Sequence, residues 1–361
     1  MKEYQLKTRQ ICLFFIAFVP SIKFFMFPSV IANIAKESLW ISTLLNFLID
    51  AFTIFILIKV CKKTDKTFYS LLEQNFNKKL ANAVYVLYSI YFFLKAILPI
   101  CEQKDFIELT LYPTSASIIN FIPFFIIAFY LSCKHLRIIG RASDVMWIIT
   151  LLGSILLFSL AISNVDFGAF LPIVAIGIKP VIKASYSALN WFGDAVYLLF
   201  FIGEFKFSKK DGVKILGSFG ISIITTIIFV VIFFGTFTSI AFRQKFALTE
   251  TSKYSTVINN IGRIDYLGIF FIIASNIFST AMPLYFSNYT INKVINPKNN
   301  RITPFILTLL LFAVIIFLKE YFNSIENFFI NYAGWFFLLF GNVIPIFTMF
   351  LAKKEKKIEL T

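Results

Sequence analysis

The sequence predicts an all-α integral membrane protein with about ten transmembrane helices, arranged as two halves of five helices with inverted topology. Three observations predict it: an apolar composition, hydrophobic segments of spanning length, and Lys and Arg concentrated in alternate loops. Of 361 residues, 58% are hydrophobic and 15% charged, against about 45–50% and about 25% in soluble domains. This composition excludes a secreted domain, a disordered chain and most cytosolic enzymes.

Hydropathy locates ten segments of the length that a bilayer requires, about 17–25 residues. The connections between them are short, so we expect one transmembrane domain, 1–361, with a first repeat at about 11–163 and a second at about 183–352. The predicted segments are 11–33, 39–60, 82–101, 118–134, 144–163, 183–205, 213–240, 264–290, 303–319 and 331–352.

Lys and Arg are distributed unevenly between the loops. If the N-terminus is inside, the inside loops hold 23 of these residues and the outside loops hold 9. Positive residues collect in cytoplasmic loops, so we expect a multi-pass protein with both termini in the cytoplasm. The same asymmetry explains most of the net charge of +15, and no nucleic-acid partner is expected.

The first helix of each half contains residues that interrupt a helix. The first segment carries two prolines within 20–28, and the sixth carries Asn190, Gly193 and Asp194 within 187–194. Proline removes a backbone donor, and glycine gives the backbone freedom. Broken helices at corresponding places of inverted halves are typical of secondary transporters, whose ligand site lies near the midplane. We therefore expect both helices to be broken there.

Four charged residues fall inside the predicted segments, where each costs about 2.5–3.5 kcal/mol on insertion scales. They are Lys23, Asp50, Lys95 and Asp194. We expect Lys23 and Asp194 to face each other beside the two breaks and to serve function. Asp50 and Lys95 form either a buried structural pair or a functional one, and the sequence leaves both open.

Enzymatic and metal-binding patterns are absent from the sequence. It contains no GxSxG, HExxH, P-loop or GxGxxG motif. The single His135 lies in a short basic loop, and the four cysteines are far apart. We therefore expect no enzyme, no catalytic residue, no metal and no cofactor.

Polar and aromatic residues on two further segments are candidates for a pocket. Tyr85, Tyr88 and Tyr91 share one helical face and either line a pocket or pack between helices. A polar face at Ser275, Asn276 and Ser279 either joins helices or contacts a substrate. The predicted ligand-binding residues are Pro20, Ser21, Lys23, Tyr88, Tyr91, Asn190, Gly193, Asp194, Ser275 and Asn276.

Four short motifs resemble those of the spore germination permeases, the B subunits of GerA-type germinant receptors, within the amino acid–polyamine–organocation superfamily. They keep the order of that family's motifs along nearly the whole chain. Two of them have Asp144 and Asp265 where the family usually has Glu, and Lys23 stands in a stretch where the family has small residues. The motifs are Lys36-Glu37-Ser38-Leu39-Trp40-Ile41-Ser42, Gly140-Arg141-Ala142-Ser143-Asp144, Phe170-Leu171-Pro172-Ile173 and the stretch 258–266.

The resemblance implies a LeuT-like fold and a receptor subunit in the bacterial cell membrane or the spore inner membrane. It implies that the subunit binds a small germinant, typically an amino acid, near the bilayer midplane. It also implies partners, an A-type membrane subunit and a C-type lipoprotein. The alternatives are a secondary transporter for amino acids or related molecules, possibly coupled to protons, and a scaffold whose pocket is vestigial.

Overall fold

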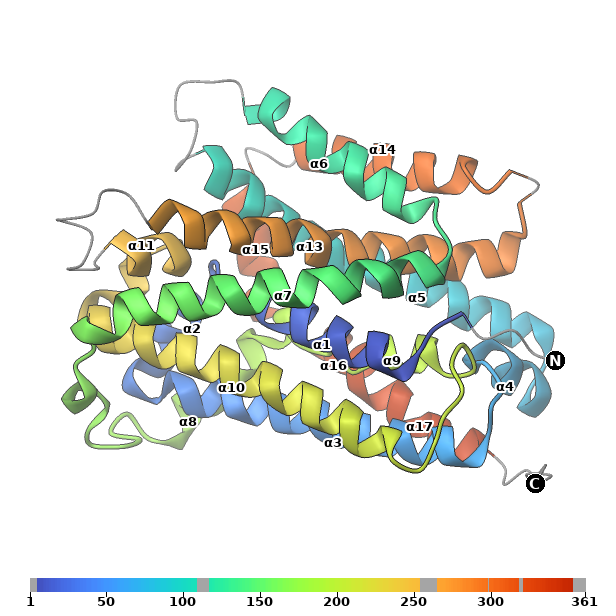
Figure 1. Ribbon diagram of the computed structural model, residues 1–361, viewed down its shortest axis with the longest axis horizontal. Coiled ribbons are helices and arrows are strands. Elements are labelled where there is room, and N and C mark those ends of the chain that lie inside the picture. Colours follow the sequence, from blue (N-terminus) through green and yellow to red (C-terminus); the bar gives the residue numbers. More distant parts are fainter. Residues whose placement is uncertain (1–4, 109–116, 254–264, 298, 318–320, 353–361) are drawn as a thin grey trace.

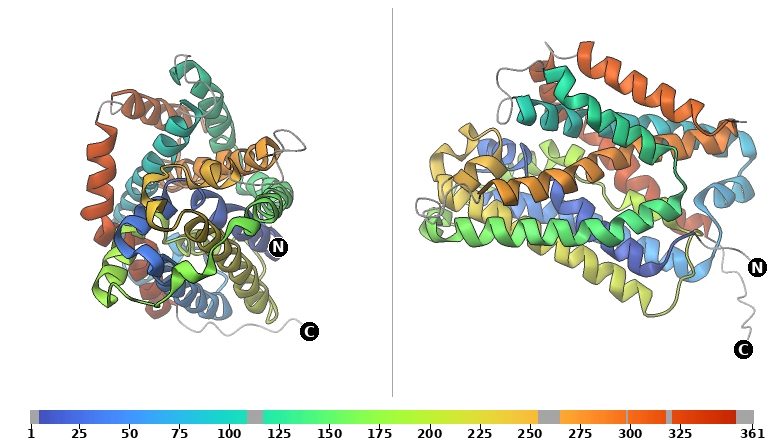
Figure 2. Two further views of the ribbon diagram at one scale, coloured as in Figure 1. Left: turned by 90° about the vertical axis from the view of Figure 1, so that its left-hand side faces the viewer. Right: turned by 45° about the horizontal axis from the view of Figure 1, so that its top comes forward.

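The long helices run side by side along one axis of the molecule (Figures 1 and 2). The computed structural model describes residues 5–108, 117–253, 265–297, 299–317 and 321–352. These residues are mainly helical, which confirms the predicted all-α membrane class. The motif at 258–266 lies largely outside the described residues.

The first half of the chain contains three long helices, α3, α5 and α7, and several shorter elements. The elements are α1 (Thr8–Ile22), α2 (Phe27–Ala35), η1 (Lys36–Ser38), α3 (Leu39–Lys63), α4 (Phe68–Asn75), α5 (Lys78–Phe106), α6 (Ser117–Ser132), α7 (Leu136–Ala161) and η3 (Ile162–Asn164).

The second half repeats this alternation of long helices and short pieces. The elements are η4 (Phe167–Phe170), α8 (Ile178–Ser187), η5 (Leu189–Trp191), α9 (Val196–Phe201), α10 (Asp211–Phe237), η6 (Thr238–Arg243), α11 (Ala247–Lys253), α13 (Asp265–Ile295), α14 (Ile302–Phe317), α15 (Phe322–Asn331), α16 (Gly334–Leu338), the π-turn η7 (Leu339–Val343) and α17 (Ile344–Leu351).

The described residues contain six helical runs long and apolar enough to cross a membrane. A seventh results if α14 and α15, bent by 109°, form one span. Three shorter apolar helices, Thr8–Ile22, Phe121–Ser132 and Leu189–Phe201, account for the remaining predicted segments. Length and composition thus support a multi-pass protein, and the division into two repeats stays a prediction.

Helix α1 lies in the interior, where it packs against α7, α10 and α13. Nearly all of its side chains from Phe14 to Ile22 are buried. Large apolar side chains are instead exposed on the flanks of the bundle, as at Phe52, Ile126 and Phe270. An apolar flank is what a surface in contact with lipid tails requires.

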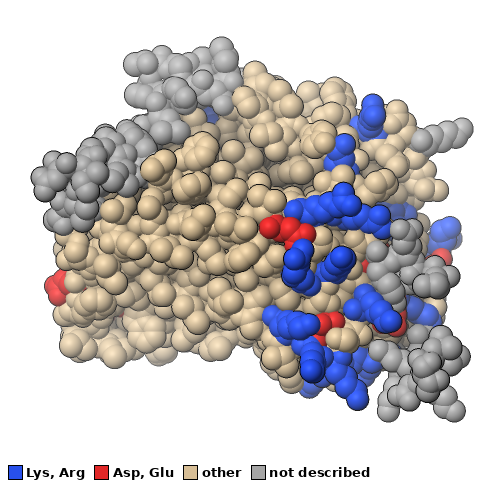
Figure 3. Space-filling view, viewed as in Figure 1, with Lys and Arg blue, Asp and Glu red and all other residues tan. Residues whose placement is uncertain are grey.

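The start of α1 and the end of α17 lie at one end of the bundle (Figure 1). On the face shown in Figure 3, Lys and Arg side chains gather at that same end, and the flank of the bundle is almost free of charge. We call this the basic end. Its side chains include exposed Arg9 and Lys214.

Two expected helices are broken, as the sequence predicts. Residues 23–26 separate α1 from α2, and residues 188–195, which include η5, separate α8 from α9. We call these the first and second breaks. Gly193 in the second break has a φ of 76°, a conformation that favours glycine.

Three stretches assigned to loops from the sequence are helical instead. Helix α5 continues to Phe106, so Glu102, Gln103 and Lys104 are buried within it. The predicted loop 241–263 contains α11, and the predicted loop 319–330 contains most of α15. Hydropathy missed these helices because their polar faces lower the average over a spanning window.

Candidate functional site

A buried ion pair joins the two breaks. Lys23 ends α1, and its Nζ lies 2.6 Å from Oδ2 of Asp194 in the second break. Neither side chain has any exposed surface. The ammonium also donates to the carbonyl of Val19 at 3.1 Å and lies 4.8 Å from the centre of the Phe192 ring. Each charge is thus compensated at a depth where an isolated charge would be costly.

The other two predicted charges also converge on the second break, but they do not pair with each other. The Nζ of Lys95 donates to the carbonyl of Phe192 and lies 3.7 Å from Oδ1 of Asp194. The carboxylate of Asp50 accepts from the amides of Gly193 at 3.1 Å and Asp194 at 3.2 Å. Asp50 and Lys95 each satisfy backbone groups that the break leaves open, and whether they serve structure or function stays a prediction.

Asp50 is also held by a residue near the C-terminal end of the chain. The side-chain amide of Asn342, in η7, donates to Oδ1 of Asp50 at 2.7 Å and to the hydroxyl of Thr53 at 3.1 Å. Close packing permits this contact, because a Cβ on Gly193 would lie 3.1 Å from the Cα of Gly341. The backbone of the π-turn η7 at Gly341 thus packs directly against the backbone of the second break at Gly193.

The loop helix α11 satisfies two backbone carbonyls of the first break, and the Ser29 hydroxyl satisfies a third. Pro28 has no amide hydrogen, so it cannot donate the usual helical hydrogen bond to the carbonyl of Phe24, four residues earlier. It accepts instead from the amide of Leu248 at 3.0 Å, and the carbonyl of Phe25 accepts from the amide of Ala247 at 3.1 Å. The start of α11 is therefore hydrogen-bonded directly to the first break.

Glu102 is a further buried ionisable residue near the breaks. Its Oε1 accepts a hydrogen bond from the indole of Trp191, in η5, at 2.9 Å, and the residue is 2% exposed. Glu102 escaped prediction because it lies one residue beyond the predicted end of its segment.

The remaining predicted ligand-binding residues are buried. Some of their polar atoms have hydrogen-bond partners in the protein and others do not. Ser21 and Ser275 share a hydrogen bond at 2.7 Å, and the hydroxyl of Tyr88 donates to the carbonyl of Phe340 at 3.2 Å. Pro20 lies buried inside α1. Polar side-chain atoms of Tyr91, Asn190 and Asn276 are buried without a protein partner.

A cavity of about 460 Å³ opens beside the first break, and different residues line it. It touches Met26 in the break and Ser29 in α2, and it carries the charged side chains of Lys183, Lys245 and Glu326. We call it the asparagine cavity, after four further residues of its lining, Asn33, Asn323, Asn327 and Asn331.

The sequence contains one signal for this cavity. Asn323, Asn327 and Asn331 recur every four residues, which puts them on one face of α15. Their segment was assigned to a loop, so the spacing was not read as a helix face.

Metal coordination has no support in the part of the chain that the structure describes. There, no group of three or more His, Cys, Asp and Glu side chains is arranged to hold a metal ion. The interior site instead consists of two ammonium groups and two carboxylates, which can hold or exchange protons and bind charged groups.

Comparison with solved structures shows the fold. Two point mutants of the manganese transporter of Eremococcus coleocola superpose with a TM-score of 0.61 at 10% identity, covering 95% of this chain and 78% of theirs. The same transporter in complex with an aromatic bis-isothiourea compound gives a TM-score of 0.56 at 11% identity, covering 94% and 78%. The chain thus shares the fold of this manganese transporter.

Comparison with curated proteins gives no match. The family comparison is decisive, because residues 5–327 match the family described as spore germination protein, the spore permeases. The chain is therefore a permease-like, multi-pass membrane protein that belongs to the spore germination protein family.

Proposed function

We propose that this protein binds a small zwitterionic germinant, an amino acid, and signals its presence to an A-type membrane subunit and a C-type lipoprotein. The asparagine cavity carries the proposal, because it is the described cavity that reaches a broken helix. The proposed site thus lies at the mouth of the first break, not deeper in the bundle where the sequence predicts it.

The lining of the asparagine cavity suits a zwitterion. Lys183 and Lys245 offer positive charge for a carboxylate, and Glu326 offers negative charge for an ammonium group. Amide side chains can donate and accept, so the four asparagines can bind either end of the ligand. A volume of about 460 Å³ exceeds what an amino acid of ordinary size needs.

A short stretch of backbone connects this cavity to the buried ion pair. Met26 and Ser29 line the cavity, and Lys23 precedes them at the end of α1. Ser29 donates to the carbonyls of Met26 at 2.8 Å and Lys245 at 3.3 Å. A ligand that displaces Ser29 or Lys245 would therefore act on the first break, and through Lys23 on Asp194.

The alternative is a secondary transporter, and its support is the shared transporter fold together with the buried carboxylates Asp50 and Asp194. Against it, the Lys23 ammonium contacts Asp194 where a coupling cation would sit in ion-driven relatives. A fixed ammonium removes the need for sodium, so a carrier of this kind would be linked to protons.

We further propose that the basic end faces the cytoplasm, with both termini there. The clustering of Lys and Arg at that end supports this orientation (Figure 3). The asparagine cavity would then open toward the opposite side, from which a germinant arrives.

The test is thermal unfolding of the purified protein in lipid nanodiscs against a panel of amino acids. We expect at least one amino acid to raise the unfolding temperature, and Lys183→Gln to abolish that rise. Lys179→Gln is the matched control, because Lys179 is exposed one turn earlier on α8 and lies outside the cavity lining.

Uptake of the stabilising amino acid into proteoliposomes separates the two functions. A receptor subunit should bind without accumulating it, and a carrier should accumulate it when a proton gradient is applied. Failure of every amino acid to stabilise the protein, or an equal response in both variants, would contradict the proposed site.

A further inference from the structure

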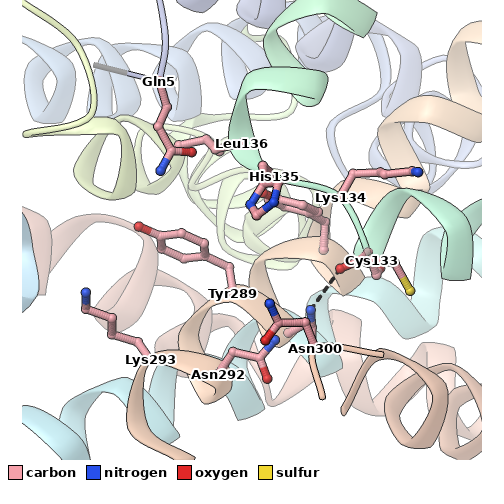
Figure 4. A pocket seen from close by; sticks show the side chains of 12 residues that line it. Gln5, Cys133, Lys134, His135, Leu136, Tyr289, Asn292, Lys293 and Asn300 are labelled. Atoms are coloured by element: carbon pink, nitrogen blue, oxygen red, sulfur yellow. Dashed lines mark hydrogen bonds between the residues drawn. The ribbon is translucent and has the colours of Figure 1, made fainter. Parts of the chain in front are cut away.

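A second cavity, of about 390 Å³, lies at the basic end. Figure 4 shows the side chains that line it. Its lining comes from Gln5 before α1, from the connection between α6 and α7, and from the last turns of α13. We call it the basic-end cavity. It shares no lining residue with the asparagine cavity.

Helix α7 begins at this cavity without a side-chain cap. Its N-cap residue, His135, has an extended backbone but makes no capping hydrogen bond, and His135 and Leu136 both line the cavity. The first amides of a 26-residue helix, with the positive end of its dipole, favour an anion at this position.

Two buried polar side chains of the lining lack partners, which independently indicates a ligand. Ser132 is 3% exposed and Asn288 is 4% exposed, yet Oγ of Ser132 and Oδ1 of Asn288 have no hydrogen bond. Asn288 uses its amide nitrogen to donate to the carbonyl of Ser132 at 2.9 Å, so its free atom is an acceptor. A ligand with an acceptor for the serine hydroxyl and a donor for Oδ1 of Asn288 would satisfy both.

The charge of the lining selects an anion. Lys134 and Lys293 bring positive charge to it, and no Asp or Glu belongs to it among the described residues. Glu204 contacts one lining residue: its Oε1 accepts from the hydroxyl of Tyr289 at 3.3 Å. The ammonium of Lys293 lies 5.6 Å from the centre of the Tyr69 ring.

The cavity lies at the level where the apolar flank ends, which favours a lipid as the source of the anion. Tyr130 and Phe305, 57% and 56% exposed, stand on α6 and α14, the helices that adjoin the cavity. The apolar flank thus ends where the basic end begins, which is the level of lipid headgroups. Basic pockets between transmembrane helices at this level bind anionic headgroups.

We propose that the basic-end cavity binds the phosphoglycerol headgroup of an anionic phospholipid. The phosphate would accept from Ser132 and from the start of α7, with Lys293 as its countercharge, and a glycerol hydroxyl would donate to Asn288. Bound there, the lipid would tie the N-terminal segment at Gln5 to α7 and α13, which both pack on α1.

Lipid retention tests this proposal. The purified protein would be examined by native mass spectrometry for bound phosphatidylglycerol, and by thermal unfolding in phosphatidylcholine nanodiscs with and without phosphatidylglycerol. We expect retention of the anionic lipid and a higher unfolding temperature. Lys293→Gln should weaken binding by about fivefold, the typical effect of one basic residue at a membrane surface.

Ser132→Ala should weaken the same binding by several-fold, and it keeps the proposal testable if Lys293→Gln proves unstable. Lys209→Gln, an exposed lysine outside the lining, is the matched control and should change nothing. Equal retention in all variants would overturn the proposal. So would stabilisation by inorganic phosphate or glycerol 3-phosphate in nanodiscs where phosphatidylglycerol has no effect.

Discussion

Both helix breaks leave backbone groups without helical hydrogen bonds, and different groups satisfy them in each break. In the second break, the open backbone groups are satisfied by charged side chains of α3 and α5, Asp50 and Lys95. In the first break, the amides of Ala247 and Leu248 satisfy two carbonyls. The second break is therefore fixed to the interior of the bundle, and the first is fixed to a loop helix at its end.

This difference indicates how a signal can travel. A loop helix can move when a ligand binds beside it, and buried charges hold their positions because separating them is costly. The first break would then be the responsive one, and the ion pair between Lys23 and Asp194 would transmit its movement to the second.

The largest expected effect follows from removing the charge of the second break. Asp194→Asn leaves the ammonium groups of Lys23 and Lys95 without their shared carboxylate. We expect a loss of about 3–5 kcal/mol in the free energy of unfolding, typical of a broken buried pair. Lys23→Met should cost less, because Lys95 remains 3.7 Å from Asp194. Chemical denaturation in detergent measures both; an equal loss would mean that Lys95 does not support Asp194.

The next effect concerns the close packing at the second break. Gly193→Ala places a Cβ 3.1 Å from the Cα of Gly341, in a backbone conformation with a φ of 76°. Strain and overpacking together should cost about 2–4 kcal/mol. Gly217→Ala is the control, because its Cβ would meet no atom within 4 Å inside α10. A loss no greater than that of the control would show that the second break accommodates a side chain.

A smaller effect is expected at the first break. Ala247→Pro removes the amide that donates to Phe25 but should leave α11 intact, because proline is tolerated at the first position of a helix. We expect a loss of about 1–3 kcal/mol, the cost of one unsatisfied carbonyl. The variant should also lose the rise in unfolding temperature caused by the amino acid. If the amino acid still raised the unfolding temperature of this variant fully, α11 would have no role in signalling.

The smallest effect on stability should come from the asparagine cavity itself. Lys245 is 38% exposed and pairs with Asp105 at 3.1 Å. Lys245→Gln should change the free energy of unfolding by less than about 1 kcal/mol, as expected for a partly exposed pair. Binding of the amino acid, measured by calorimetry, should nevertheless weaken. A large loss of stability with normal binding would assign Lys245 a structural role instead.

The sequence was most informative where a charged residue stands within an apolar segment. Charges within apolar segments identified Lys23, Asp50, Lys95 and Asp194, because few other residues are so costly at that depth. The pairing of Asp50 could not be predicted, since its partners are backbone amides and Asn342, an uncharged residue more than 280 positions away. Hydropathy also could not find the asparagine cavity, because α15 is polar enough to resemble a loop.

A double-mutant cycle on Lys23 and Asp194 tests most directly whether the two breaks are coupled. The free energy of unfolding would be measured for the wild type, Lys23→Met, Asp194→Asn and the double variant. We expect the double variant to be more stable than Asp194→Asn alone, with a coupling energy of about 2–3 kcal/mol, and to fold without responding to the amino acid. Losses that add to within about 0.5 kcal/mol would contradict the account, because the two breaks would then be independent.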